Sequence, residues 1–335
     1  MENKMREFRR DIITGRWIII STERAKRPFT FVKYPREIDD VDTCPFCWGN
    51  EKFTPPEIVA YRPQNTQKDT PGWQVRTIPN KYPALRVEGE VIKSACGIYD
   101  CITGIGAHEV IIETPHHDKD IYQLELNNVI DIFRMYKERI EDLKRDIRFE
   151  YILVFKNCGQ NAGATLSHPH SQLIALPMIP IIIQQELEGA KKYYEFKERC
   201  VYCDIINEEL KTNLRVVTEN DDFIAICPYA SRFPFEVWIL PKRHDPMYED
   251  IHYNELKNLA SIMKIINKKL NLALENPPYN YLLHTSPLKH SNLHYYHWHI
   301  EIIPILTGIG GFEWGTGFYI NPVEPEEATK FLQQI

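Results

Sequence analysis

The feature that most constrains the fold of this chain is an internal duplication. Residues 109–117 (EVIIETPHH) and 236–244 (EVWILPKRH) are two β-rich runs that each end in a histidine. Each run is followed at a similar distance by a His-x-His pair, which starts 51 residues after His117 in the first half and 53 residues after His244 in the second. Chance rarely preserves order, residue type and spacing together. We therefore interpret the chain as one structural unit present twice.

The segments between these landmarks predict the same elements in both halves. Apolar residues spaced by three, four and seven over 126–147 and 256–270 predict helices that each bury one face. The apolar runs 151–155 and 280–283 then predict strands. A chain of 335 residues can give each half a core of its own. The prediction is an α+β fold with two antiparallel sheets and flanking helices, divided into residues 1–180 and 181–335.

Two regions fall outside this repeat. The Pro-rich, polar stretch 50–80 has no counterpart in the second half, and we interpret it as a long loop. The join between the halves is placed near residues 177–180 or in the charged, helix-like run 184–198.

The cysteines indicate metal binding more than disulfides. The N-terminus has no apolar signal region, so the eight cysteines are expected to be reduced, in a cytoplasmic protein. Four of them form two Cys-x-x-Cys pairs, and the other four are interpreted as ordinary thiols. Those four are Cys96, Cys101, Cys158 and Cys227.

Equivalent metal ligands recur in the two halves. The predicted sets are Cys44, Cys47, His117 and His168 in the first half, and Cys200, Cys203, His244 and His297 in the second. Zinc accepts thiolate and imidazole ligands in tetrahedral geometry, and four protein ligands make a closed, structural site. We therefore predict two zinc ions per chain.

An alternative for the second half is a site rich in oxygen and nitrogen ligands, which would favour iron or zinc. It would use Glu186, His284, His299 and possibly Glu301, although the intact Cys200/Cys203 pair argues against it. The remaining histidines are interpreted as surface or packing residues. They are His108, His116, His252, His290 and His294.

The first His-x-His pair suggests phosphoryl chemistry. A histidine that binds metal cannot also attack phosphorus, so His168 and His170 must divide these roles. A neutral imidazole is nucleophilic near pH 7 and forms a reactive phosphoramidate. Gln172 shares a face with His170 in an extended segment, and its amide can donate to a phosphoryl oxygen without activating water. Glu301 holds the matching place in the second half and would repel phosphate, so that half is expected to be catalytically silent.

Composition limits the partners. Hydrophobic residues make up 43% of the chain and charged residues 26%, with a formal net charge of -6, which is no footprint for nucleic acid or an anionic membrane. No run approaches the roughly 18 apolar residues of a membrane span. Phosphate binding must therefore be local. Candidates are Arg24, Arg27 and the segment 157–165, which matches neither a Walker loop nor a dinucleotide fingerprint.

Taken together, these residues resemble the galactose-1-phosphate uridylyltransferase family, the transferase branch of the histidine triad superfamily. The motifs that carry the resemblance are Arg24-Ala25-Lys26-Arg27-Pro28, Cys44-Pro45-Phe46-Cys47, Asn80-Lys81-Tyr82-Pro83-Ala84-Leu85, the stretch 157–172 and Gly311-Phe312-Glu313. The resemblance implies two histidine-triad-like halves in a homodimer. It also implies His170 as the uridylylated nucleophile with Gln172 as its phosphate partner. Nucleotide contacts would come from Arg24, Arg27, Asn80, Asn157 and Thr165, and sugar contacts from Phe312 and Glu313.

The implied reaction is ping-pong transfer between nucleotide sugars and sugar 1-phosphates, namely UDP-glucose with galactose 1-phosphate. Ser171, the Cys200/Cys203 pair and the tail 312–322 also resemble relatives that transfer adenylyl groups from ADP-glucose to phosphate. Two other functions remain as alternatives. One is a histidine triad hydrolase, disfavoured because Gln172 replaces its usual third histidine, and the other is a non-enzymatic double-zinc module that binds a partner.

Overall fold

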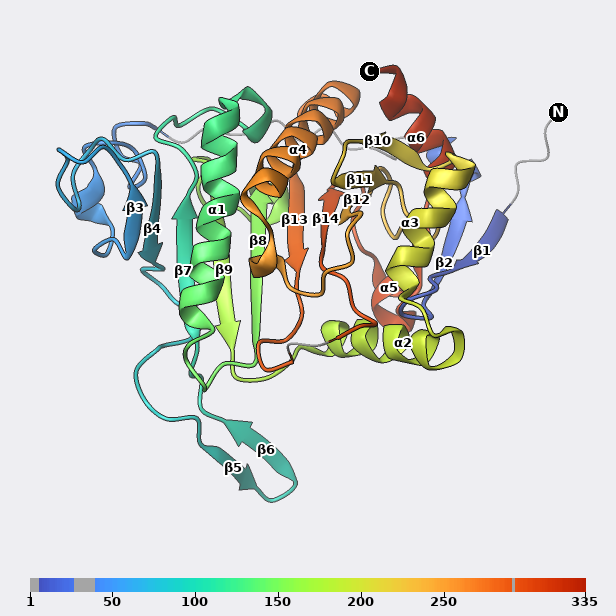
Figure 1. Ribbon diagram of the computed structural model, residues 1–335, viewed down its shortest axis with the longest axis horizontal. Coiled ribbons are helices and arrows are strands. Elements are labelled where there is room, and N and C mark those ends of the chain that lie inside the picture. The colour runs from blue at the N-terminus through green and yellow to red at the C-terminus, as the bar shows by residue number, and fades with distance from the viewer. Residues whose placement is uncertain (1–5, 27–39, 291–292) are drawn as a thin grey trace.

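The computed structural model describes residues 6–26, 40–290 and 293–335, and its central feature is a continuous antiparallel sheet (Figure 1). The sheet has ten strands, in the order β10 (Val216–Glu219), β11 (Phe223–Ile226), β12 (Val237–Pro241), β14 (His299–Pro304), β13 (Tyr279–His284), β8 (Tyr151–Cys158), β9 (His170–Leu176), β7 (Ala107–Ile112), β4 (Val75–Pro79) and β3 (Val59–Tyr61). β13 pairs with β8, so the sheets of the two halves join edge to edge. The predicted α+β fold is confirmed, with its two sheets merged into one.

One face of this sheet is covered by two long helices, α1 (Leu126–Leu143) and α4 (Tyr253–Leu274), which pack against each other (Figure 1). Strand side chains alternate between the faces, so Ile111 and Leu173 pack into the core beneath these helices. Val110 and Ile112 point to the opposite face and pack with the first cysteine pair. The predicted helix 126–147 ends early, at Leu143, and Ile147 is exposed. No helix of the described residues is long and apolar enough to cross a bilayer.

In the second half the opposite face is covered by α2 (Ile181–Lys197) and α3 (Val201–Thr212), which share a core with Trp238 and Leu240. Beside them lies a small three-stranded sheet of β1 (Arg6–Arg10), β2 (Trp17–Ser21) and β15 (Tyr319–Asn321). The chain closes with α5 (Gly311–Thr316) and α6 (Pro325–Gln334). The proposed join at residue 180 lies between the end of β9 and the start of α2.

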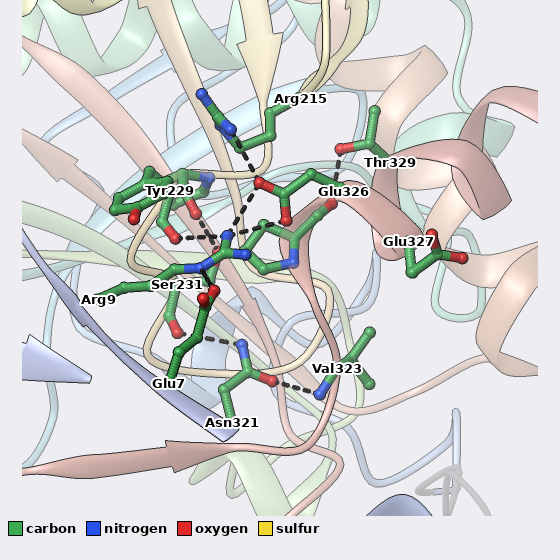
Figure 2. A network of polar contacts seen from close by, with 12 residues as sticks. Glu7, Arg9, Arg215, Tyr229, Ser231, Asn321, Val323, Glu326, Glu327 and Thr329 are labelled. Atoms are coloured by element: carbon green, nitrogen blue, oxygen red, sulfur yellow. Dashed lines mark hydrogen bonds and ion pairs between the residues drawn. The ribbon is translucent and has the colours of Figure 1, made fainter. Parts of the chain in front are cut away.

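A polar network ties the N-terminal strand to the C-terminal helix (Figure 2). Arg9 of β1 and Arg215 each donate to the Glu326 carboxylate of α6 at 2.8 Å. Both guanidinium groups also lie over the Tyr229 ring, with 4.7 and 5.3 Å between the guanidinium carbon and the ring centroid. Segments from the two ends of the chain are therefore held together at the β10 side of the molecule.

The prediction of a long loop over residues 50–80 is wrong in part. This stretch contains β3 and β4, which extend the sheet as an antiparallel hairpin. The buried guanidinium of Arg76 supports the hairpin by donating to Glu57, Thr54 and Asp69. The polar residues that suggested a loop therefore hydrogen-bond to one another at the folded edge of the sheet. A second hairpin, β5 (Lys93–Cys96) and β6 (Tyr99–Ile102), projects from the body of the molecule (Figure 1).

Candidate active site and metal centres

The first predicted set of metal ligands comes together on the sheet face opposite α1. Cys44, Cys47, His117 and His168 are all buried, and their ligand atoms lie within 4.8 Å of one another. Cys47 Sγ is 3.2 Å from His117 Nδ1 and 3.5 Å from His168 Nδ1. The Nε2 atom of His168 lies 2.8 Å from the Thr114 carbonyl oxygen, to which it donates, so Nδ1 carries the lone pair that faces the thiols. Burial lowers the pKa of His168 to about 3, which keeps the ring neutral.

The second set forms the same arrangement in the other half. The ligand atoms of Cys200, Cys203, His244 and His297 also lie within 4.8 Å of one another. Cys203 Sγ is 3.4 Å from His244 Nδ1 and 3.8 Å from His297 Nδ1. His297 Nε2 lies 2.7 Å from the Pro241 carbonyl oxygen, which matches the 2.8 Å contact of His168 Nε2 with the Thr114 carbonyl oxygen. The duplication therefore extends to the hydrogen bond that orients each histidine.

Both sets fit a tetrahedral zinc ion. With zinc–sulfur bonds near 2.3 Å and zinc–nitrogen bonds near 2.0 Å, a tetrahedral centre separates sulfur from nitrogen by about 3.5 Å. Five of the sulfur–nitrogen distances in the two clusters lie between 3.2 and 3.8 Å, and all the ligand atoms of each cluster lie within 4.8 Å of one another. Thiolate and imidazole donors together are the set that zinc prefers. Four protein ligands would leave no position open for substrate.

A third cluster holds the residues considered as an alternative for the second half. Glu186, His284, His299 and Glu301 are buried, and their ligand atoms also lie within 4.8 Å of one another. It shares no residue with the cysteine cluster, so the two sets coexist, and the cysteine pair does not argue against it. Its charges are largely paired within the protein, since His284 Nδ1 lies 3.0 Å from Glu186 Oε1 and Arg232 donates to Glu301.

His170, the predicted nucleophile, begins strand β9 and is held in one tautomer. Its Nδ1 lies 2.8 Å from the carbonyl oxygen of His168 and must donate to it, which leaves the lone pair on Nε2. The ring of Phe46 packs against it edge to face, with 5.3 Å between ring centroids. Burial, with the nearby positive charge of Lys156, lowers the pKa of His170. The arrangement presents a neutral imidazole with a free Nε2, as a nucleophile requires.

A pocket of about 100 Å³ lies beside His170, and the glycine-containing segment 157–165 forms one wall. Gly159 and Gly163 have φ values of +86° and +89° and allow a tight 3₁₀ turn over Gln160–Ala162. Two predicted phosphate contacts, Asn157 and Thr165, line this pocket. The structure therefore places them with His170.

The other predicted substrate residues are arranged differently. Asn80 lies outside the pocket lining but near Gln172, through a histidine that both side chains contact. Arg24 lies in the 3₁₀ turn Thr22–Lys26, and Phe312 and Glu313 lie on α5, beside the second half (Figure 1). None of these three lines the pocket. Arg27 lies outside the described residues.

The histidine between Asn80 and Gln172 is His108, which the sequence predicts to be a surface or packing residue. Its Nε2 lies 2.8 Å from Gln172 Oε1 and 3.1 Å from Asn80 Nδ2, so it contacts two of the predicted site residues. Strand alternation could have suggested the contact. His108 pairs with Ile174 in the register of β7 and β9, and it therefore lies on the face that carries Gln172 and His170.

A larger cavity, of about 720 Å³, lies in the second half between the turn after β1, α2 and α3. His299 and Glu301 are at its wall. The ring of His299 lies between Trp238 and Tyr202, with centroid distances of 5.3 and 5.2 Å. Although burial opposes ionisation, Arg232 and the two neighbouring histidines lower the pKa of Glu301 to about 2. A carboxylate beside a covered imidazole is poorly suited to receiving phosphate, so size alone does not identify this cavity as the active site.

Comparison with known proteins agrees with this architecture. Residues 1–180 match the galactose-1-phosphate uridyl transferase N-terminal domain, and residues 186–322 match its C-terminal domain. An ADP-glucose phosphorylase of Arabidopsis thaliana is 39% identical over 100% of this chain and 94% of its own, and a galactose-1-phosphate uridylyltransferase of Thermotoga maritima is 29% identical over 98% of both. The crystal structure of an Arabidopsis thaliana ADP-glucose phosphorylase with bound ADP-glucose superposes with a TM-score of 0.84, at 36% identity over 99% of each chain. The chain is an enzyme of the galactose-1-phosphate uridyl transferase family, a nucleotidyltransferase whose two halves both match that family.

Proposed function

We propose that this enzyme transfers a nucleotidyl group through a covalent intermediate on His170 Nε2. The observation that carries the proposal is the hydrogen bond from His170 Nδ1 to the His168 carbonyl, which leaves Nε2 unprotonated beside a pocket. Nε2 would attack the phosphorus that bears the nucleoside, and the bond to the sugar phosphate oxygen would break, releasing the sugar 1-phosphate. An acceptor phosphate oxygen would then displace Nε2 from that phosphorus and regenerate the free imidazole.

The surroundings of His170 support transfer to phosphate oxygens. Gln172 would donate to a phosphoryl oxygen as charge develops in the transition state. Asn157 and Thr165 line the pocket beside His170, of which Gln172 is not a lining residue, and would bind the remaining oxygens. The pocket volume of about 100 Å³ suits a phosphoryl group, so the nucleoside and the sugar would extend beyond it. Neither a hydrolase nor a zinc-only interaction module explains a fixed nucleophile beside a neutral amide donor.

For the substrates, we favour ADP-glucose as donor and inorganic phosphate as acceptor. The 39% identity to the Arabidopsis phosphorylase over the whole chain supports this pair. UDP-glucose with galactose 1-phosphate is the second candidate, supported by the two family domains and by the Thermotoga relative. Both reactions would use the same histidine.

We also propose two zinc ions, one in each cysteine cluster, with structural roles. Zinc at the first cluster would anchor His168 and, through its carbonyl, the ring of His170. The Glu186 cluster has ligands for iron or zinc, but its internal ion pairs favour a site without metal. Elemental analysis distinguishes these states.

A homodimer completes the proposal. Phe312 and Glu313 lie on α5 and do not line the His170 pocket of their own chain. In a homodimer, a second copy would bring α5 to the part of the site outside this pocket, where the sugar would extend. Light scattering of the purified protein measures the oligomeric state, and a monomer that retains full activity would contradict this arrangement.

The test of the activity is covalent labelling. Metal-replete enzyme is incubated with ADP-glucose or UDP-glucose labelled at the nucleoside-bearing phosphorus, and protein-bound label and released glucose 1-phosphate are counted. We expect acid-labile label in stoichiometric proportion to glucose 1-phosphate, followed by transfer of the label to added phosphate or galactose 1-phosphate. Absence of label with both donors would refute the covalent mechanism.

A further inference from the structure

We infer that His108 is a positioning residue that holds the Gln172 amide with its NH₂ group directed away from His108, along the strand toward His170. The inference rests on the proposed function, because it assigns the donor that would meet the phosphoryl group. It concerns a residue that touches neither substrate nor nucleophile. Its evidence is the set of hydrogen bonds around the His108 ring.

The backbone determines the tautomer of His108. The N–H of Ala84 donates to His108 Nδ1 at 3.1 Å, so Nδ1 must carry a lone pair. A neutral imidazole with a free Nδ1 has its proton on Nε2. If both ring nitrogens were protonated, the Nδ1–H and the Ala84 N–H would be two donors facing each other, which is unfavourable. His108 is therefore a donor at Nε2.

Among the described residues, one neighbour of Nε2 can accept that proton. Asn80 Nδ2 approaches to 3.1 Å, but the orientation of this amide is set by Tyr82, whose backbone N–H donates to Asn80 Oδ1 at 2.8 Å. Asn80 thus presents a second donor, and its approach to Nε2 adds no hydrogen bond. The remaining neighbour is Gln172 Oε1, at 2.8 Å. If the Gln172 amide were flipped, its NH₂ group would become a third donor beside the ring, with the Ala84 N–H and the Asn80 NH₂ group. A neutral imidazole accepts only one hydrogen bond, so these neighbours determine the orientation of the Gln172 amide.

The register of the strands shows what this orientation achieves. His170 pairs with Ile112, Gln172 with Val110, and Ile174 with His108. Gln172 therefore lies between His108 and His170 on one face of the sheet. With Oε1 held by His108, the amide NH₂ is available on the side of His170. Because Gln and Asn amides can otherwise rotate by half a turn at little cost, a fixed partner prevents Oε1 from being presented to an anionic phosphoryl oxygen.

The segment Asn80–Ala84 has a matching role. It holds His108 by two hydrogen bonds: the backbone N–H of Asn80 donates to the His108 carbonyl at 2.8 Å, and the backbone N–H of Ala84 donates to Nδ1 of the ring at 3.1 Å. The motif Asn80-Lys81-Tyr82-Pro83-Ala84-Leu85 therefore has a structural role, because its Ala84 N–H determines the tautomer of His108.

The test is a double-mutant cycle on the rate of covalent labelling. Removing one preorganised donor costs about 10²- to 10³-fold, which is the loss expected for Gln172→Ala. His108→Phe should lose about tenfold or more but no more than Gln172→Ala, and it should add nothing in the Gln172→Ala background. His108→Gln, which can place an N–H near the position of Nε2, should recover most of the rate. His108→Glu should be as slow as Gln172→Ala, because a carboxylate accepts from the amide and turns Oε1 toward the site.

Several outcomes would overturn the inference. Losses for His108→Phe and Gln172→Ala that multiply, or an unchanged rate in His108→Phe, would show that His108 does not act through Gln172. Failure of the unmodified enzyme to take up label would instead refute the proposed function. The exposed His294 supplies a matched control, since His294→Phe should label normally.

A measurement without substrate checks the same assignment. Nitrogen-15 chemical shifts of the histidine rings distinguish the two neutral tautomers, and we expect His108 to carry its proton on Nε2. A proton on Nδ1 would overturn the inference whatever the catalytic rates.

Discussion

The two halves share one framework and differ beside the second histidine of each His-x-His pair. Nδ1 of His170 and of His299 each face the carbonyl oxygen of the histidine two residues earlier, at 2.8 and 3.1 Å. The next residue on that strand face is a neutral amide, Gln172, in the first half and a carboxylate, Glu301, in the second. The duplication therefore preserved the scaffold and changed the electrostatics of one position.

Strand pairing extends this difference to a second position. Val110 lies opposite Gln172 as Trp238 lies opposite Glu301, so His108 corresponds to Glu236. The comparison of the runs 109–117 and 236–244 matches Glu109 with Glu236, so it differs by one residue from the correspondence that the strand pairing gives. In the first half a neutral histidine holds a donor amide in place. In the second half Arg232 bridges two carboxylates, those of Glu236 and Glu301, in a closed ion-pair network. The first half therefore presents a neutral amide donor that an anion could accept from. In the second half the carboxylates at the matching positions are paired with Arg232.

The largest effect on this comparison is expected when His170 and His299 are each replaced by asparagine. His170→Asn removes the nucleophile and should reduce covalent labelling by about 10⁴-fold or more, the scale seen when an enzyme loses its nucleophile. His299→Asn should label at a rate close to that of the unmodified enzyme, per folded molecule as judged by circular dichroism. Label retained in His170→Asn, or lost in a folded His299→Asn, would reverse the roles of the halves.

A smaller effect is expected when the neighbouring charges are exchanged. Gln172→Glu places a carboxylate where an anionic phosphoryl group should lie, and we expect labelling to slow by about 10²- to 10³-fold. Glu301→Gln should leave labelling intact but cost about 1–3 kcal/mol in the free energy of unfolding, because the buried Arg232 loses a charged hydrogen bond. Single-turnover labelling and urea titration measure the two effects. Equal slowing by both variants would contradict a silent second half.

These differences also show what could be predicted from the sequence. Cysteine and histidine are uncommon, so their order and spacing selected eight side chains that the structure gathers into two clusters. The joining of the sheets through β13 and β8 uses backbone hydrogen bonds, which leave no side-chain signature in either strand. β3 and β4 were missed because their polar neighbours are paired within the fold, as at Arg76. His108 was missed because its role depends on Ala84, which reaches it only through tertiary structure.

Loss of a metal ligand should separate structure from catalysis. Cys47→Ser and Cys203→Ser should each reduce zinc from about two ions to about one per chain, as measured by elemental analysis. Both should lower the melting temperature, since metal binding to the native state stabilises it. Only Cys47→Ser should also slow labelling, by about 10- to 100-fold, because His168 orients His170. Zinc content that stays unchanged in either variant would count against that cluster as a zinc site.

The smallest expected effect concerns the network between β1, at the start of the first half, and α6 of the second half (Figure 2). Although burial opposes ionisation, Arg215 and Arg9 lower the pKa of Glu326 below its usual value. A carboxyl whose pKa is lower in the folded state stabilises the protein above its unfolded pKa, near 4.5, and this stabilisation is lost as the pH falls through the folded value.

Glu326→Gln should therefore cost about 1–3 kcal/mol in the free energy of unfolding at pH 7, and the difference from the unmodified enzyme should shrink below about pH 4. Glu327→Gln, at the neighbouring exposed position on the same helix, should change stability by less than about 0.5 kcal/mol at either pH. A Glu326→Gln deficit that persists undiminished in acid would mean that packing of the side chain, and not its charge, holds the two ends of the chain together.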